Sequence, residues 1–236
     1  MRNLLIFGFF VIALVMIQFT AKAQTADEVI GKYITAMGGK EKLLSLTSVK
    51  MTGNISIQGT DVSLTITKLH NVGFRNDIEV MGTSNYQVVT PTKGVMFMPI
   101  QGMSSPTDMT EEQLKASVVQ LDVQSPLLNY KEKGNTVELM GTEKIDGEDN
   151  YKLKLTYKNG VVSMYYIGSK NNRLNKTSGK RTINGEETDI ETTYTNYKQN
   201  ADGYWFAYTV TSIQGETNYD KIETNVKVDE SIFKAN

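Results

Sequence analysis

Apolar and polar residues alternate along most of the chain between residues 47 and 228. Residues 62–67 and 151–157 show this pattern most clearly, because every second side chain in them is apolar. A period of two is typical of strands in a sheet with one apolar face. Dipeptides that favour tight hairpins separate several of these segments, at Asp146-Gly147, Asn159-Gly160, Asn184-Gly185 and Asp202-Gly203. Alternation and turn spacing together predict about eleven antiparallel strands.

The segment before these strands has the period of a helix. Thr25 and Glu28 have the spacing of a capping box, in which each side chain bonds the backbone at the other position. Gly38-Gly39 then supplies a helix end. We therefore predict a helix over residues 27–37, packed in the concave side of the sheet, and a short helix over residues 40–46. One face of the first helix is apolar, with Ala26, Val29, Ile30, Tyr33, Ile34 and Met37.

Residues 91–126 interrupt the strand pattern, and they hold all four prolines and four of the methionines. Thr110 and Gln113 have the spacing of a second capping box, which predicts a helix inserted between strands. Its apolar face would carry Leu114, Val118 and Leu121. The pattern fits two interpretations, a helix that fills one end of the core or a movable lid over an apolar cavity.

Residues 1–23 have the pattern of a secretory signal peptide. Arg2 precedes an apolar run over residues 4–17, and Ala21-Lys22-Ala23 places small residues at the positions that a signal peptidase requires. The apolar run is too short to cross about 30 Å of hydrocarbon comfortably. We expect cleavage after Ala23, export to the periplasm, and a mature chain of one domain over residues 24–236.

Composition excludes several functions. The chain has no cysteine, which excludes disulfides, a catalytic thiol and an attached lipid. Without Arg2 and Lys22 the net charge is −3, which argues against nucleic acid as a partner. A single histidine, His70, cannot form a histidine-clustered metal site, and we interpret it as structural. We therefore expect neither a cofactor nor a metal.

An enzyme is the least favoured class. The acidic pairs Glu186-Glu187 and Asp189 with Glu191 could be proposed as acid and base carboxylates. They lie beside the hairpin at Asn184-Gly185, where charges commonly keep a strand edge unpaired and soluble. Because no motif places a nucleophile beside a base, we expect no catalytic residues.

Both ends of the mature chain resemble a known family. Residues 26–34, 37–43 and 48–53 are similar to the start of exported LolA-like proteins, the outer-membrane lipoprotein-sorting carriers, and residues 222–233 are similar to their last strand and tail. Residues 202–206 are similar to a hairpin of that family. The resemblance implies an α+β fold, a half-open antiparallel β-barrel wrapped around the N-terminal helix and closed by inserted helices.

The resemblance also implies a function, which is to shelter the acyl chains of lipoproteins or lipids on their way to the outer membrane. The partners would be lipidated proteins or lipids and membrane-bound donor and acceptor proteins, with the carrier as a monomer. The alternative is a non-catalytic envelope module that binds a protein partner with the same fold. The candidate cavity residues are Val62, Leu64, Ile66, Ile78, Val80, Phe97 and Met98, and the candidate lid residues are Leu114, Val118 and Leu121.

Overall fold

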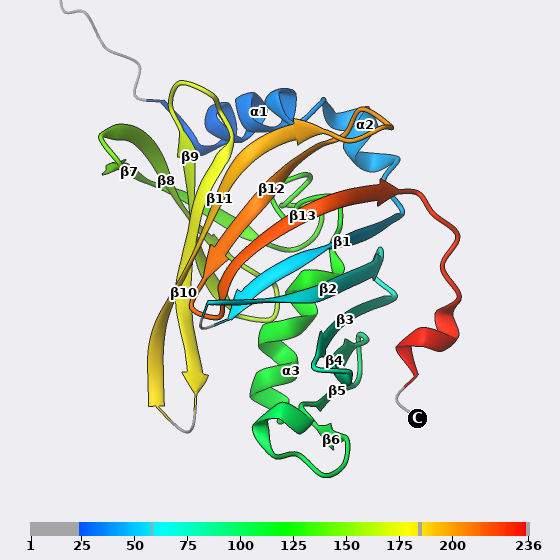
Figure 1. Ribbon diagram of the computed structural model, residues 1–236. Helices are drawn as coiled ribbons and strands as arrows, with labels where there is room; N and C mark the ends of the chain where they lie inside the picture. Colours follow the sequence, from blue (N-terminus) through cyan, green and yellow to red (C-terminus); the bar gives the residue numbers. More distant parts are fainter. Residues whose placement is uncertain (1–23, 58, 184–185, 235–236) are drawn as a thin grey trace, which may run out of the picture.

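A computed structural model describes residues 24–57, 59–183 and 186–234, and one antiparallel sheet of 13 strands runs through them (Figure 1). The strands are β1 (Ser48–Ile57), β2 (Thr60–Leu69), β3 (Gly73–Val80), β4 (Thr83–Val89), β5 (Gly94–Phe97), β6 (Thr107–Asp108), β7 (Thr136–Ile145), β8 (Glu148–Thr156), β9 (Val162–Gly168), β10 (Leu174–Ile183), β11 (Glu186–Gln199), β12 (Trp205–Ser212) and β13 (Gly215–Thr224).

Their order across the sheet is β6-β5-β4-β3-β2-β1-β13-β12-β11-β10-β9-β8-β7. Because β1 pairs with β13, the first six strands and the last seven form two halves of one sheet. β6 and β7 follow each other in the sequence and lie at the two far edges, so the sheet is open. The predicted number of about eleven strands was too low. The short β5 and β6 lie within residues 91–126, where prolines interrupt the alternation.

Three of the predicted turns connect neighbouring strands. Asp146 and Gly147 both have positive φ, 49° and 80°, and join β7 to β8 in a two-residue hairpin. Gly160 lies between β8 and β9, and Gly203 lies between β11 and β12. The predicted turn at residues 184–185 lies outside the described residues, as do the predicted signal peptide and its cleavage site.

The helices are α1 (Ala26–Ala36), α2 (Lys40–Leu44) and α3 (Glu111–Ser117), with 3₁₀ turns η1 (Pro99–Gln101), η2 (Val118–Leu121) and η3 (Glu230–Phe233). Both predicted capping boxes are present. The Thr25 hydroxyl accepts from the Glu28 amide at the start of α1, and the Thr110 hydroxyl accepts from the Gln113 amide at the start of α3. None of the helices in the described part of the chain is long and apolar enough to span a membrane.

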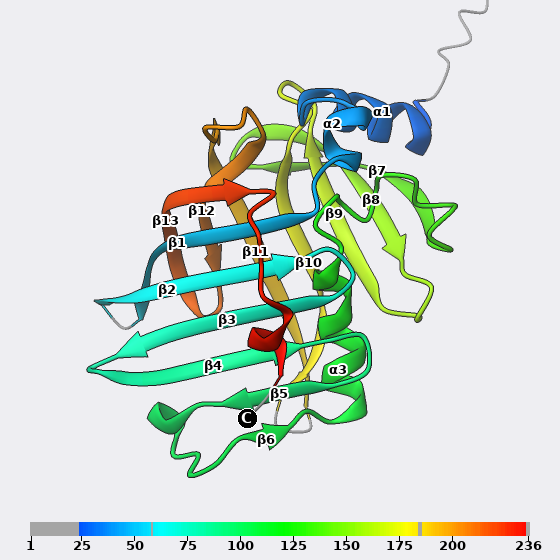
Figure 2. The same cartoon turned by 90° about the vertical axis from the view of Figure 1, so that its right-hand side faces the viewer.

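The two faces of the sheet are covered by different segments. We call the inner face the side that carries Val62 and Tyr165, and both α1 and α3 lie on it. The C-terminal segment crosses β2 and β3 on the outer face (Figure 2). There Arg75 Nη1 donates to the carbonyl of Ile232 at 3.0 Å, and the Phe233 ring occupies the space where Gly73 lacks a side chain.

The largest core lies where α1 meets the β7–β9 end of the sheet (Figure 1). α1 therefore lies against one end of the inner face. The resemblance had implied a sheet wrapped around this helix, and the structure differs in that respect. Its apolar stripe meets the inner-face residues of β8 and β9 and the loop before β7. The buried members of this core are Val29, Ile30, Tyr33, Ile34, Leu43, Leu127, Leu128, Tyr130, Leu153, Leu155, Tyr165 and Ile167.

Candidate functional site

Five of the predicted cavity residues lie together on the inner face. Cross-strand pairing places Leu64 opposite Ile78, and Val62 and Val80 occupy the same face nearer the turns. With Ile66 they form one apolar cluster that also contains Ile55 and Tyr219. The alternation of β2 therefore identified a contiguous apolar surface, because a strand directs every second side chain to the same side.

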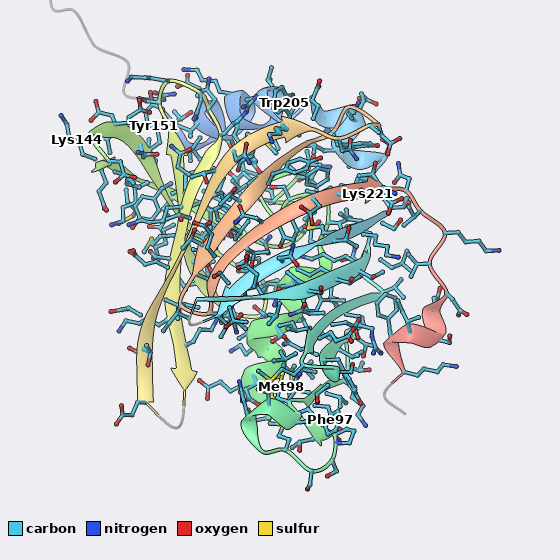
Figure 3. All side chains as sticks on the ribbon, viewed as in Figure 1. Phe97, Met98, Lys144, Tyr151, Trp205 and Lys221 are labelled. Carbon is cyan, nitrogen blue, oxygen red and sulfur yellow. The ribbon has the colours of Figure 1, made fainter. Side chains whose placement is uncertain are left out.

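Phe97 lies apart from this cluster. It pairs with Tyr86 across β4 and β5, whereas its neighbour Met96 pairs with Gln87 on the inner face. The Phe97 and Tyr86 rings pack on the outer face with centroids 5.6 Å apart. Met98 comes directly after the last residue of β5 and before η1 (Figure 3). We therefore place Phe97 outside the candidate site.

The candidate lid residues cover a second apolar cluster on the inner face. Leu114, Val118 and Leu121 pack with Phe74 and Val89, which are buried in β3 and β4. Ile66 belongs to this cluster and to that of the cavity residues, so the two predicted sets meet at one side chain.

α3 reaches both halves of the sheet. It contacts β5 in the first half and β10 in the second. α3 therefore connects the first and second halves of the sheet on the inner face.

Two side chains from the second half of the sheet hold the C-terminal end of α3. Arg181 Nη1 on β10 donates to the Ala116 carbonyl at 2.7 Å, and Asn159 Nδ2 donates to the Lys115 carbonyl at 2.9 Å. Carbonyls in the last turn of a helix have no helical partner and accept such bonds readily. Burial lowers the pKa of Arg181. We call these two bonds the latch. The sequence had marked Asn159 only as a hairpin residue and Arg181 not at all.

The segment that follows α3 is anchored more firmly. The Asn71 amide donates to the Leu121 carbonyl at 2.9 Å, and His70 Nδ1 accepts from the Val123 amide at 3.3 Å. Asp122 forms a 2.6 Å ion pair with Lys133. The predicted structural role of His70 agrees with this position, where burial lowers its pKa. η2 is thus fixed to the β2–β3 turn.

Phenol groups line the inner face of the second half of the sheet. The hydroxyl groups of Tyr157 and Tyr165 share a hydrogen bond of 2.8 Å, and Tyr194 contacts Thr177 in the same way at 3.3 Å. Burial raises the pKa of Tyr157 and Tyr219 to about 12 and also raises that of Tyr194. These phenols are neutral at physiological pH, so this part of the face combines apolar area with hydroxyl groups that can bond a ligand's oxygens.

Two hollows lie away from α3. One, of about 420 Å³, opens between the β1–β2 and β3–β4 turns and is lined partly by Val62 and Val80. The other, of about 500 Å³, lies beside α1 and the β9–β10 turn. Neither is lined by a residue of α3. The inner face beneath α3 is instead filled by the apolar cluster around Phe74, so a ligand would have to displace α3 to reach it.

Two of the four acidic residues considered for catalysis form ion pairs between β10 and β11. Glu187 pairs with Lys180, and Glu191 pairs with Lys176 at 3.0 Å. Both contacts join lysines and glutamates on adjacent strands, as charged sheet surfaces commonly do. In the ranges that the structure describes, potential metal ligands do not gather in groups of three or more.

Comparison with known proteins identifies the fold. No protein-family model and no curated sequence matches this chain. A LolA superfamily protein from Nitrosomonas europaea has a TM-score of 0.55 and 16% identity, over 90% of this chain and 99% of that chain. A putative outer membrane lipoprotein-sorting protein domain from Vibrio parahaemolyticus has a TM-score of 0.50 and 16% identity, over 87% and 94%.

A third solved structure, a DUF1329 family protein from Desulfovibrio piger, has a TM-score of 0.50 and 11% identity, over 89% of this chain and 98% of that chain. At these identities the likeness is one of fold. The chain therefore has a fold of one open antiparallel sheet with helices on its inner face. Its fold is similar to that of the LolA superfamily protein and the lipoprotein-sorting domain, so the resemblance seen in the sequence is confirmed at the level of fold.

Proposed function

We propose that this protein is an exported, non-catalytic carrier that shelters acyl chains of lipids or lipoproteins against the inner face of its sheet. The observation that carries the proposal is the position of α3. It covers buried apolar residues of the first half of the sheet while none of its own residues is fully buried. The latch from Arg181 and Asn159 holds its C-terminal end.

Displacement of α3 would make an apolar surface available to a ligand. Phe74 and Val89 would lose the cover of Leu114, and an acyl chain could replace that cover. Each CH₂ group that leaves water contributes about 0.8 kcal/mol, so several methylenes offset the loss of the contacts that α3 makes. The hydroxyl groups of the inner-face tyrosines could bond ester or amide oxygens next to the acyl chain.

Lipid extraction tests the proposal directly. Protein isolated from its native envelope is extracted with organic solvent, and the extract is examined by mass spectrometry. We expect co-purified acyl lipid with the unaltered protein and much less with Leu114→Asp/Val118→Asp, because two charges on the covering face weaken closure. The matched control, Lys115→Asp/Ser117→Asp, changes neighbouring positions of α3 that lie outside the apolar cluster.

Absence of lipid from the unaltered protein, together with no binding of a fluorescent fatty acid, would refute the carrier function.

One observation favours a second candidate, a module that binds a protein partner. The inner face under α3 is filled, and both hollows lie elsewhere. A protein that co-purifies stoichiometrically from the envelope while extracts contain no lipid would support that candidate.

A further inference from the structure

Four exposed apolar side chains lie at or beside turns at one end of the strands. Their exposed fractions are 36% for Ile57, 96% for Met81, 57% for Ile100 and 69% for Ile213. Ile57 ends β1, Met81 lies in the β3–β4 turn, Ile100 lies in η1 after β5, and Ile213 lies in the β12–β13 turn. We call these four residues the tip row.

Strand register places the four tips at the same end of neighbouring strands, three in the first half of the sheet and Ile213 at the start of the second. Ser56 pairs with Glu216, which sets the β12–β13 turn beside the end of β1. Ser63 pairs with Glu79, which sets the β3–β4 turn beside the β1–β2 turn. The Ile100 amide donates to Asn85 near the start of β4 at 3.1 Å. Figure 2 shows the β1–β2 and β3–β4 turns on one side of the molecule.

The β3–β4, β1–β2 and β12–β13 turns are separated from one another by two strand spacings each, or about 10 Å. The β1–β2 and β3–β4 tips therefore form separate projections rather than the continuous apolar patch that a protein partner would bury. A fluid lipid surface can accept separate side chains of this kind, because its molecules rearrange around each one.

The charged residues around the tips indicate whether a neutral or an anionic lipid bilayer fits them. Residues 56–61, 79–84, 97–106 and 211–216 contain no lysine or arginine, and their charged residues are Asp61, Glu79 and Glu216. Peripheral binding to anionic lipid depends on basic residues near the surface. A neutral bilayer therefore fits these turns better than an anionic one.

The backbone at Met81 supports a role other than packing. Its φ is 50°, in the left-handed region that residues other than glycine seldom occupy and that turns usually give to Asn, Asp or Gly. A large, almost fully exposed apolar side chain in that conformation does not favour the turn. It also makes no contacts with the core. Local departures of this kind concentrate at functional positions.

We propose that the tip row inserts into the interfacial region of a neutral lipid bilayer, with the turns at this end of the strands facing the membrane. This contact goes beyond acyl-chain binding by the inner face and does not require it. It would hold the protein transiently at a membrane surface, since a few apolar side chains bind reversibly and without a spanning segment.

Flotation with phosphatidylcholine vesicles tests the proposal. The unaltered protein is compared with Ile57→Ser/Met81→Ser/Ile100→Ser/Ile213→Ser, and all proteins share the same N-terminus. We expect the four substitutions to lower the partition coefficient on the order of tenfold or more, because several apolar side chains lose their burial. The control, Leu44→Ser/Met140→Ser/Val162→Ser, removes other exposed apolar side chains and should bind as the unaltered protein does.

A tryptophan placed at a tip locates the contact. Met81→Trp should be quenched by brominated phosphatidylcholine, and Met140→Trp, at an exposed position on β7, should not. Adding phosphatidylglycerol to the vesicles should weaken flotation. The proposal is overturned by absence of flotation of the unaltered protein, by equal loss in both Ser variants, or by tighter binding to anionic vesicles. Binding of a soluble fatty-acid probe by the four-site variant reports the inner face separately.

Discussion

The two capped helices on the inner face begin in the same way and pack differently. α1 and α3 each start with a complete capping box. α1 buries Val29, Ile30, Tyr33 and Ile34 in the largest core, whereas α3 has no buried residue of its own. A capping box fixes where a helix begins, but burial of its apolar face decides how strongly it is held.

This difference assigns the helices to different units of stability. The contacts of α1 are continuous with buried strands β8 and β9, so it should open only when the whole domain unfolds. α3 has partly exposed apolar contacts on β3 and β4 and the latch at its end. Segments with few buried contacts open locally at a lower free energy than the core.

The largest effect should come from charges placed on the apolar faces of the two helices. Val29→Asp/Ile34→Asp places two unpaired carboxylates in the core and should abolish folding. The free energy needed to bury them exceeds the typical stability of a domain, which is about 5–15 kcal/mol. Leu114→Asp/Val118→Asp should leave the sheet folded. Circular dichroism and thermal unfolding distinguish the two. Complete unfolding of the α3 variant would show that α3 is part of the core.

Removal of the latch should act locally. Arg181→Met deletes the charged hydrogen bond to the Ala116 carbonyl, so the free energy of opening α3 should fall by about 1–3 kcal/mol. Hydrogen exchange of residues 111–121 should accelerate while that of α1 stays the same. Arg75→Met is the matched control, because Arg75 makes the same type of bond to the Ile232 carbonyl on the outer face. Equal acceleration in both variants would contradict a latch specific to α3.

The two capping threonines give a smaller and paired effect. Thr25→Ala and Thr110→Ala each remove one side-chain cap, worth about 1 kcal/mol. Thr25→Ala should lower the melting temperature of the domain, since α1 belongs to the core. Thr110→Ala should leave the melting temperature nearly unchanged and raise hydrogen exchange in α3. A similar fall in melting temperature in both variants would remove the distinction between the helices.

The smallest effect is a dependence on pH at the anchor after η2. Burial holds the pKa of His70 below its ordinary value of about 6.5. The negative charge of Asp122 raises this pKa and the positive charge of Lys133 lowers it, but burial has the larger effect. The unfolded or opened state therefore binds the proton more readily. Neutral His70 contributes its full share to the free energy of unfolding above about pH 6.5. This contribution falls as the pH decreases toward the pKa of His70 in the folded state.

Protonation also removes the acceptor that Nδ1 offers to the Val123 amide. At about pH 5, exchange of residues 118–123 should be faster than at about pH 7, after correction for intrinsic rates. His70→Gln should lack this dependence, and α1 serves as the internal control. An identical change in the substituted protein would assign the effect to another group.

The sequence predicted the parts of the molecule that depend on local patterns. The alternation of Val62, Leu64 and Ile66 identified an apolar strand face, and both capping boxes identified helix starts. Phe97 was grouped with the cavity residues through its place in the sequence, although the register puts it beside Tyr86 on the outer face.

Long-range contacts had no such signal. Arg181 bonds a backbone carbonyl 65 positions away, and a carbonyl has no sequence signature. The phenol of Tyr194 reaches the inner face from a strand whose other residues are mostly polar. The pairing of β1 with β13 joins the two halves of the sheet from opposite ends of the chain, and no local pattern predicts it.

Hydrogen exchange with and without ligand tests the central claim, that α3 is a displaceable cover over a lipid-binding inner face. The exchange of residues 111–121 is compared with that of α1, in the free protein and with a saturating fatty acid below its micelle concentration. The account predicts that α3 exchanges much faster than α1, and that the fatty acid changes exchange in α3 and in β3 and β4 but leaves α1 unaltered. Equal protection of α3 and α1 in the free protein, with no response to the fatty acid, would contradict it.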